Sequence, residues 1–273
     1  MGLIPDPPGV ITGGEILFEG TDLLKLSKQR LRAIRGNKIS MIFQDPMTSL
    51  NPVVTVGDQI AESIRIHEKL SRADAALKAK DMLELVGIPG DRYGEYPHQF
   101  SGGMKQRVII AIALSCNPEV ILADEPTTAL DVTIQAQVLD LISKLKKEKN
   151  TSMILITHDL GVVVEICDKV AIMYAGEIVE YGSLEQIYDQ TAHPYTKGLF
   201  GSIPDIEAKT SRLKPIPGLM PDPSNLPEGC SFEPRCERSC QLCKEENLPL
   251  IEIGNGHFVK CHNYRKVGEG EDV

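Results

Sequence analysis

Short apolar runs between polar turns are the strongest pattern in this chain. They occupy residues 39–43, 120–123 and 153–156, and runs of this length are typical of parallel strands that are covered on both faces. Between the last two runs, apolar residues recur at helical spacing from Ile134 to Leu145, and lysines gather where that helix would end, at the negative end of its dipole. The alternation of strand, helix and strand predicts an α/β fold with a parallel sheet and right-handed connections.

Helical signals dominate the segment between the first two apolar runs. Ser71 is followed three residues later by Asp74, a pairing similar to a capping box, and Gly87 and Pro89 would end the helix that begins there. We therefore expect a helical subdomain over about 45–100.

The C-terminal part of the chain is rich in proline and lacks the regular apolar pattern of the earlier part. Beyond about Tyr188 the regular pattern disappears, and repeated prolines forbid long helices. These prolines are Pro204, Pro215, Pro217, Pro221, Pro223 and Pro227. The sequence therefore predicts an α/β domain over 1–188 and an irregular, cysteine-rich extension over 189–273.

Composition narrows the class of protein. The 273 residues carry a formal net charge of −9, which offers no basic field for a nucleic-acid backbone. The longest apolar runs fall short of the roughly 20 residues that cross a bilayer. Seven cysteines are an odd number, with five in the last part of the chain, so a reduced compartment with a metal site fits better than a secreted disulfide framework.

Polar residues that suit phosphate chemistry follow each apolar run. Gln44 follows the first, Asp124 and Glu125 follow the second, and His158 follows the third. Ligands of α/β sheets bind at the carboxyl ends of the strands, so we expect these side chains at one edge. There Asp124 would hold Mg²⁺, and Glu125 would polarise the water that attacks a γ-phosphate. Each residue alone also fits a plainer role, because acidic turns and strand-end histidines are common.

A second candidate phosphate site lies at the start of a predicted helix. Ser101, Gly102 and Gly103 precede an apolar helical stretch over 108–114. Two glycines at a helix start expose backbone N–H groups to an anion, and the Ser101 hydroxyl can add a donor. A plain helix cap has the same sequence, so this signal is weak by itself.

The order of these motifs identifies a family. The chain resembles the ATPase subunits of ABC transporters, whose core is similar to that of P-loop NTPases. The matching segments are the Q-loop at Gln44, the signature helix at 101–106, the Walker B strand at 120–125, the D-loop at 129–131 and the switch histidine at His158.

The resemblance implies roles for individual residues. Glu125 and His158 would carry catalysis with ATP and Mg²⁺ as cofactors, and Asp124 and Gln44 would hold the Mg²⁺. The residues expected at the nucleotide are Gln44, Ser101, Gly102, Gly103, Gln106, Asp124 and Asp131. In this family two ATPase subunits pair head to tail, so that the signature of one completes the site of the other.

A narrower resemblance concerns the C-terminal part. The segment His-Pro-Tyr-Thr-Lys at 193–197 and the cysteine-rich tail are similar to the oligopeptide/dipeptide importer branch. This implies an ATPase that energises peptide import, with a second ABC ATPase subunit, transmembrane permease subunits and, indirectly, an extracytoplasmic solute-binding protein as partners. It also implies a cytoplasmic protein, peripheral on the inner face of the cell membrane, with no nucleic acid as partner.

One family motif is missing. A P-loop requires Gly-x-x-x-x-Gly-Lys followed by Ser or Thr, and the 273 residues contain no such segment. In the family this motif lies upstream of the segment that corresponds to Met1. The resemblance therefore implies an N-terminally truncated importer ATPase, which we expect to be inactive in ATP hydrolysis alone although Ser101, Gly102 and Gly103 could still complete a partner's site.

The tail carries a candidate metal site. The resemblance assigns a [4Fe-4S] cluster to Cys230, Cys236, Cys243 and Cys261. Zinc remains an alternative, because Cys240 completes a zinc-like spacing and the tail also holds histidines, and unmetallated thiols are a third possibility. Those histidines are His257 and His262, and we expect Cys116 and Cys167 to be core residues instead.

Two other functions fit part of the sequence. DNA-repair and chromosome-maintenance ATPases share the signature and Walker B motifs, although the acidic balance and the lack of a coiled-coil insertion count against them. A non-catalytic, metal-bearing regulatory partner would explain the missing P-loop. The peptide-importer ATPase accounts for more of the chain than either.

Overall fold

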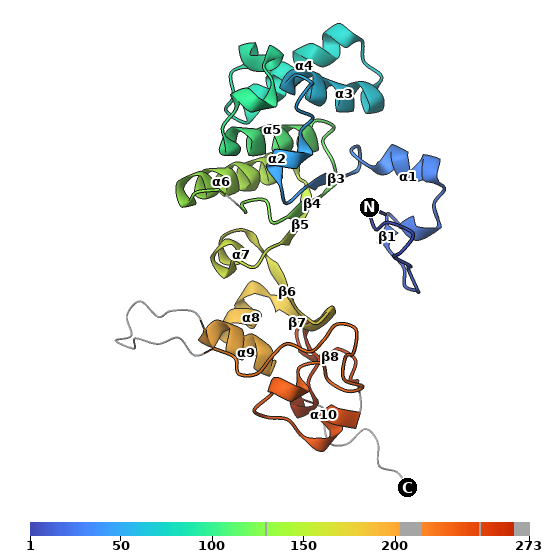
Figure 1. Cartoon of the computed structure of the whole chain (residues 1–273), viewed down its shortest axis with the longest axis vertical. Coiled ribbons are helices and arrows are strands. Elements are labelled where there is room, and N and C mark those ends of the chain that lie inside the picture. The colour runs from blue at the N-terminus through green and yellow to red at the C-terminus, as the bar shows by residue number, and fades with distance from the viewer. Residues whose placement is uncertain (129, 203–214, 246, 265–273) are drawn as a thin grey trace. The chain divides into compact units, whose positions relative to one another are not determined.

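The computed structural model describes residues 1–128, 130–202, 215–245 and 247–264, and the chain forms two compact units, Met1–Val162 and Val163–Val273 (Figure 1). The predicted boundary at 188 lies inside the second unit. The reason is that the strand Glu177–Ser183 pairs with the strand His257–Val259, which lies far along the tail. Pro204, one of the prolines on which the predicted connector rested, lies outside the described residues.

A three-stranded parallel sheet forms the centre of the first unit, as the sequence predicted. Its strands are β3 (Ile39–Ile42), β4 (Val120–Asp124) and β5 (Ser152–Ile156), in the order β3-β4-β5. Val120 is in register with Ile39 on one side and with Ser152 on the other. All three strands therefore end at the same edge, which brings the polar residues that follow them together.

Helices and short strands complete the first unit, and the predicted helical region at 45–100 is occupied by helices and 3₁₀ turns. The strands are β1 (Leu17–Phe18) and β2 (Thr21–Asp22), and the helices are α1 (Lys28–Ile34), α2 (Pro46–Ser49), α3 (Val56–Glu68), α4 (Arg72–Leu85), α5 (Gly102–Leu114) and α6 (Val132–Lys149). Ser71 caps α4 through a 3.1 Å hydrogen bond from the backbone N–H of Asp74, which confirms the predicted start.

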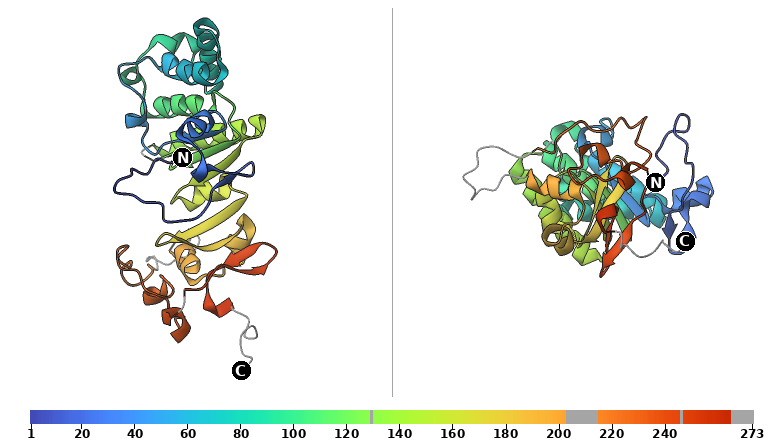
Figure 2. Two further views of the ribbon diagram at one scale, coloured as in Figure 1. Left: turned by 90° about the vertical axis from the view of Figure 1, so that its right-hand side faces the viewer. Right: turned by 90° about the horizontal axis from the view of Figure 1, so that it is seen from below.

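The core of the first unit lies on one face of the sheet. Residues of α3, α4, α5 and α6 form one apolar cluster with Met153 and Leu155 of β5, and α3 and α4 pack side by side (Figure 2). The alternate residues Ile154 and Ile156 are 57% and 52% exposed. The prediction that this strand is covered on both faces is therefore wrong for the described residues, because the helices cover only the face on which the side chains of Met153 and Leu155 lie.

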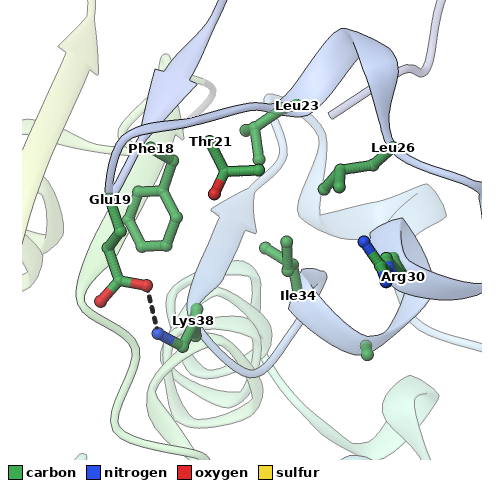
Figure 3. Close-up of a pocket in the computed structure, with 9 residues that line it drawn as sticks. Phe18, Glu19, Thr21, Leu23, Leu26, Arg30, Ile34 and Lys38 are labelled. Carbon is green, nitrogen blue, oxygen red and sulfur yellow. Dashed lines mark hydrogen bonds and ion pairs between the residues drawn. The ribbon is translucent and has the colours of Figure 1, made fainter.

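A small cavity of about 320 Å³ lies between the β1–β2 hairpin and α1 (Figure 3). Phe18 and Ile34 line it together with Lys38. The ammonium group of Lys38 forms ion pairs with Glu19 and Glu119, so its charge is already balanced by two carboxylates.

The second unit is built on an antiparallel sheet that the sequence did not predict. The strand order is β6-β7-β9-β8, and a tight turn at Asn255 and Gly256, both with positive φ, joins the last two strands. Asn-Gly is the usual sequence of such a turn. The elements are α7 (Leu160–Ile166), which crosses the unit boundary, then β6 (Lys169–Tyr174), β7 (Glu177–Ser183), α8 (Leu184–Asp189), α9 (Pro194–Gly201), α10 (Gln241–Glu245), β8 (Ile251–Gly254) and β9 (His257–Val259).

Candidate functional site

Three strand ends meet at the carboxylate of Glu125, which directly follows β4. Gln44, which follows β3, donates from Nε2 to Oε2 of Glu125 at 2.9 Å. His158, which follows β5, places Nδ1 3.0 Å from Oε1 of the same carboxylate. The structure therefore brings together three residues that the sequence placed at one edge.

A residue that sequence reasoning missed completes this cluster. The hydroxyl of Thr128 donates to Oε2 of Glu125 at 2.8 Å. Thr128 stands three residues after Glu125, and its backbone N–H donates to the carbonyl of Glu125 at 3.1 Å. A hydroxyl residue at this position of a turn was the available signal, because Ser and Thr often bond back to the start of a turn.

Hydrogen bonds set the charge state of the carboxylate. The pKa of Glu125 lies below its ordinary value, chiefly because of the hydrogen bond from Thr128, then that from His158, with Gln44 adding to the effect and burial opposing it. The carboxylate is 23% exposed and the imidazole of His158 is 75% exposed. Glu125 is thus an ionised acceptor that water can reach, as a general base requires.

A cavity of about 480 Å³ adjoins this cluster, and Gln44, Asp45 and Asp124 are among the residues that line it. Carboxylate and amide oxygens are the ligands that Mg²⁺ prefers. The Nε2 group of Gln44 donates to Glu125, so the amide oxygen of Gln44 is the atom that would act as a ligand. The oxygen donors at this cavity therefore fit the Mg²⁺ that was predicted at Asp124 and Gln44.

The predicted signature segment begins α5. The side chain of Ser101 is the N-cap and accepts the backbone N–H of Met104 at 3.4 Å. Ser101 and Gly102 are exposed, so this helix start is open to a ligand. A Cβ atom on Gly103 would stand 2.4 Å from Cγ2 of Ile134 in α6, which shows that this glycine is required by the close approach of two helices.

Gln106 occupies a different position from the rest of the signature segment. Its side chain is 1% exposed and donates from Nε2 to the carbonyl oxygen of Pro126 at 2.6 Å. In the described part of the chain, Oε1 of Gln106 has no hydrogen-bond partner. Gln106 therefore lies on the buried face of α5 and links this helix to the residue that follows Glu125. Its predicted contact with the nucleotide stays a prediction.

Asp131, from the predicted D-loop, caps the next helix. Its carboxylate accepts the backbone N–H of Ile134 at 2.9 Å at the start of α6. Ala129, the first residue of that predicted loop, lies outside the described residues. Asp131 thus has a structural role that its sequence position alone would explain.

The cysteine tail brings its thiols into one region. The backbone N–H of Cys230 donates to the carbonyl of Cys243 at 2.8 Å, and Sγ of Cys240 lies 3.4 Å from Sγ of Cys243. Burial raises the pKa of Cys261, and the charges of Cys236, Cys230 and Cys240 raise it further. Within the described ranges, however, no group of three or more acidic, histidine or cysteine side chains is arranged to hold a metal ion.

The remaining cysteines lie away from the tail. Cys116 is 8% exposed, which confirms that it is a core residue, and Cys167 is half-buried. All seven cysteines are among the described residues, and none of them forms a disulfide.

Comparisons with known proteins follow the same division of the chain. Residues 5–128 match the model of the ABC transporter family, and residues 179–243 match the C-terminal region of oligopeptide/dipeptide transporters. The dipeptide transport ATP-binding protein of Bacillus subtilis is 50% identical over 263 residues, which cover 96% of this chain and 78% of that protein. The chain belongs to the ATP-binding subunits of ABC transporters, in the oligopeptide/dipeptide branch.

Other ABC ATP-binding proteins support this assignment. The oligopeptide transport ATP-binding protein of Bacillus subtilis is 51% identical over 263 residues, or 95% of this chain and 74% of that protein. A solved ATP-binding cassette, a dimer in a post-hydrolysis state bound to ADP and Pi, has a TM-score of 0.57 and 29% identity over 63% of this chain and 74% of its own. ABC ATP-binding subunits are ATPases, and these matches give no support to a DNA-repair ATPase or a non-catalytic regulatory partner.

Among the described residues, none of the helices has the length and apolar character needed to cross a bilayer.

Proposed function

We propose that this chain is the ATP-hydrolysing subunit of a transporter that imports di- and oligopeptides. The observation that carries the proposal is the convergence of Gln44 and His158 on the carboxylate of Glu125, from three neighbouring strand ends. The sequence identity of 50% to a dipeptide transport protein and of 51% to an oligopeptide transport protein supports peptides as the solute.

Glu125 acts as the general base in this proposal. Its Oε2 atom accepts two hydrogen bonds, from Thr128 and Gln44, whereas Oε1 faces only the imidazole of His158 in the described contacts. Oε1 is therefore the atom that would take the proton of the attacking water. His158, which is largely exposed, would orient that water or contact the γ-phosphate.

Asp124 and Gln44 would hold Mg²⁺ through their oxygen atoms at the cavity that they share. When bound, Mg²⁺ would neutralise charge on the phosphate oxygens. Asp124 lies at the end of a hydrogen-bonded strand, so its position is fixed before any ligand arrives.

A second copy or a related ATPase subunit is the partner that the signature segment fits. Ser101 and Gly102 are exposed at the start of α5, while Gly103 packs against α6. We propose that these three residues and Asp131 contribute to a nucleotide site shared with the partner, in a head-to-tail dimer docked on permease subunits at the inner face of the cell membrane. An extracytoplasmic solute-binding protein would deliver the peptide to those permease subunits.

The proposal is tested by Glu125→Gln, which keeps the shape of the side chain and removes the proton acceptor. We expect ATP hydrolysis by the assembled transporter to fall by roughly 10²–10⁴-fold while ATP binding persists. The assembled transporter is used because the proposed nucleotide site is shared with a partner subunit. Wild-type hydrolysis by this variant would overturn the role of Glu125.

We also propose that the cysteine-rich extension binds a metal centre, an iron–sulfur cluster rather than zinc, through Cys230, Cys236, Cys243 and Cys261. The support is that burial raises the pKa of Cys261 and that the charges of nearby thiolates raise it further. A bound cation offsets both effects and allows such thiols to ionise and act as ligands. Because no ready metal group occurs among the described residues, the thiols must move closer together when the metal binds.

Anaerobic reconstitution with iron and sulfide tests this second proposal. The expected result is a brown protein whose iron content falls on Cys230→Ser but not on Cys116→Ser, a matched control in the core. A colourless protein with one equivalent of zinc would show that the site binds zinc and not an iron–sulfur cluster. A protein that retains neither metal would overturn a metal site in the extension.

A further inference from the structure

The turn that carries Glu125 is held in an uncommon backbone conformation. Glu125 has a φ of 43°, in the left-handed region that is unfavourable for a residue other than glycine. Its backbone N–H donates to the carbonyl of Ile156 in β5 at 2.9 Å, and its own carbonyl accepts the N–H of Thr128 at 3.1 Å. The conformation therefore persists because contacts on both sides of Glu125 maintain it.

Three groups hold the side chain of Glu125, and they divide unequally between its two carboxylate oxygens. Thr128 and Gln44 both donate to Oε2, at 2.8 Å and 2.9 Å, whereas His158 faces Oε1. Gln44 and His158 come from other strands, so their positions depend on the sheet. Thr128 belongs to the same short turn as Glu125 and is the nearest of the three donors.

We propose that Thr128 is a positioning residue for Glu125, whose hydroxyl holds Oε2 so that Oε1 points toward His158 and an attacking water. This inference rests on the proposed role of Glu125 in ATP hydrolysis. Thr128 acts through the carboxylate and takes no proton itself. The terminal torsion angle of a glutamate side chain is otherwise free to vary over a broad range. A hydroxyl that stays hydrogen-bonded to Oε2 restricts this rotation of the carboxylate.

The chain provides a matched comparison for this role. Thr128→Val keeps the branched shape and removes the hydroxyl, whereas Thr128→Ser keeps the hydroxyl and removes a methyl group. If Thr128 acted only through packing, the serine variant would lose activity and the valine variant would keep it.

ATP hydrolysis by the assembled transporter is the measurement. We expect Thr128→Val to lower kcat by about tenfold to a hundredfold, the range typical of a lost hydrogen bond to a charged group, with KM for ATP unchanged. Thr128→Ser is expected to stay within about threefold of the wild type. If the valine variant does not fold, as judged by its thermal transition, the comparison is made between Thr128→Ala and Thr128→Ser.

A double variant shows whether Thr128 acts through Glu125. In a Glu125→Gln background, Thr128→Val is expected to cause no further loss of kcat, because residues that act as a unit are not additive. A further tenfold loss in that background would overturn the inference, and so would a valine variant with wild-type kcat or a serine variant as slow as the valine variant.

The outcomes separate this inference from the function on which it rests. If Glu125→Gln hydrolyses ATP at the wild-type rate, the proposed role of Glu125 fails and the inference fails with it. If Glu125→Gln is inactive and Thr128→Val is fully active, only the positioning role of Thr128 is lost.

Discussion

Two glutamate–histidine pairs of almost equal length lie in opposite surroundings in this chain. In the first unit, Oε1 of Glu125 is 3.0 Å from Nδ1 of His158, and the side chains are 23% and 75% exposed. In the second unit, Oε1 of Glu180 is 2.9 Å from Nε2 of His257, and the exposures are 0% and 4%. The same two residue types therefore form a contact open to water in one unit and a buried contact in the other.

Glu180 shows what a buried carboxylate requires. It accepts the backbone N–H groups of Ala192 at 2.7 Å and His193 at 3.0 Å, in addition to the ring of His257. These bonds join β7 to the start of α9 and to β9, and they satisfy a charge that would otherwise be too costly to bury. Burial, rather than residue type, thus separates a structural pair from a pair that can exchange protons with water.

The first prediction compares the two glutamates directly. Glu180→Gln removes a buried charge whose three donors remain, and we expect it to lower the free energy of unfolding of the second unit by about 3–5 kcal/mol. Glu125→Gln is expected to leave the unfolding midpoint unchanged, because water replaces the lost interactions. Urea unfolding of the two variants checks this, and equal losses would show that exposure does not distinguish the pairs.

The second prediction concerns pH and His193, which lies beside Glu180. Burial lowers the pKa of His193 from 6.5 to about 4, so the unfolded chain takes up a proton first as the pH falls. The stability of the second unit is therefore full above pH 6.5 and declines as the pH falls toward 4, by about 3 kcal/mol at roughly 1.4 kcal/mol per pH unit.

His193→Asn is the matched control for this pH dependence. Asparagine keeps an acceptor for the backbone N–H of Tyr195, which His193 caps at 3.0 Å, but it does not titrate. Urea midpoints between pH 7 and pH 4 should fall less steeply in this variant. The same slope in both proteins would assign the pH dependence to other groups.

The third prediction concerns the packing of α5 against α6 in the first unit. Gly103→Ala places a methyl group 2.4 Å from Ile134, whereas the nearest atom to a methyl group at Gly102 is 4.0 Å away. We expect the alanine at 103 to cost about 1–3 kcal/mol in the unfolding of the first unit, and the alanine at 102 to cost much less. Thermal unfolding distinguishes them, and similar losses would show that α5 and α6 can move apart.

The smallest effect is predicted for Gln106→Met. This change removes a buried acceptor that has no partner among the described residues, but it leaves the carbonyl of Pro126 without its 2.6 Å donor. The two effects oppose each other, and we expect a net change within about 1 kcal/mol. A loss as large as that of Glu180→Gln would show that the bond to Pro126 is as important as the buried charge in the second unit.

Local signals in the sequence predicted the parallel strands and a helix start of the first unit. The apolar runs of β3, β4 and β5 and the cap at Ser71 are contiguous patterns, and the structure has them where they were predicted. The antiparallel sheet of the second unit was not predicted. Its strand β7 pairs with a three-residue strand in the tail, and a partner so distant leaves no periodic pattern at either position.

The candidate site was predictable to the same extent. Gln44, Glu125 and His158 follow apolar strands, so the rule that parallel strands share a carboxyl edge places them together. Gln106 lies in the helix that Ser101 caps, yet it is buried. Which face of α5 meets the turn at Pro126 depends on helix packing, and this could not be read from neighbouring residues.

The sequence by itself determined the family motifs, the parallel strands and the group of polar residues at their ends. Only the tertiary structure decided which carboxylates remain in water and which are buried, and that the hydroxyl of Thr128 donates to the carboxylate of Glu125. The physical reason is that strands and caps depend on residues close together in the chain. Burial and hydrogen-bond partnership depend on which distant segments pack against them.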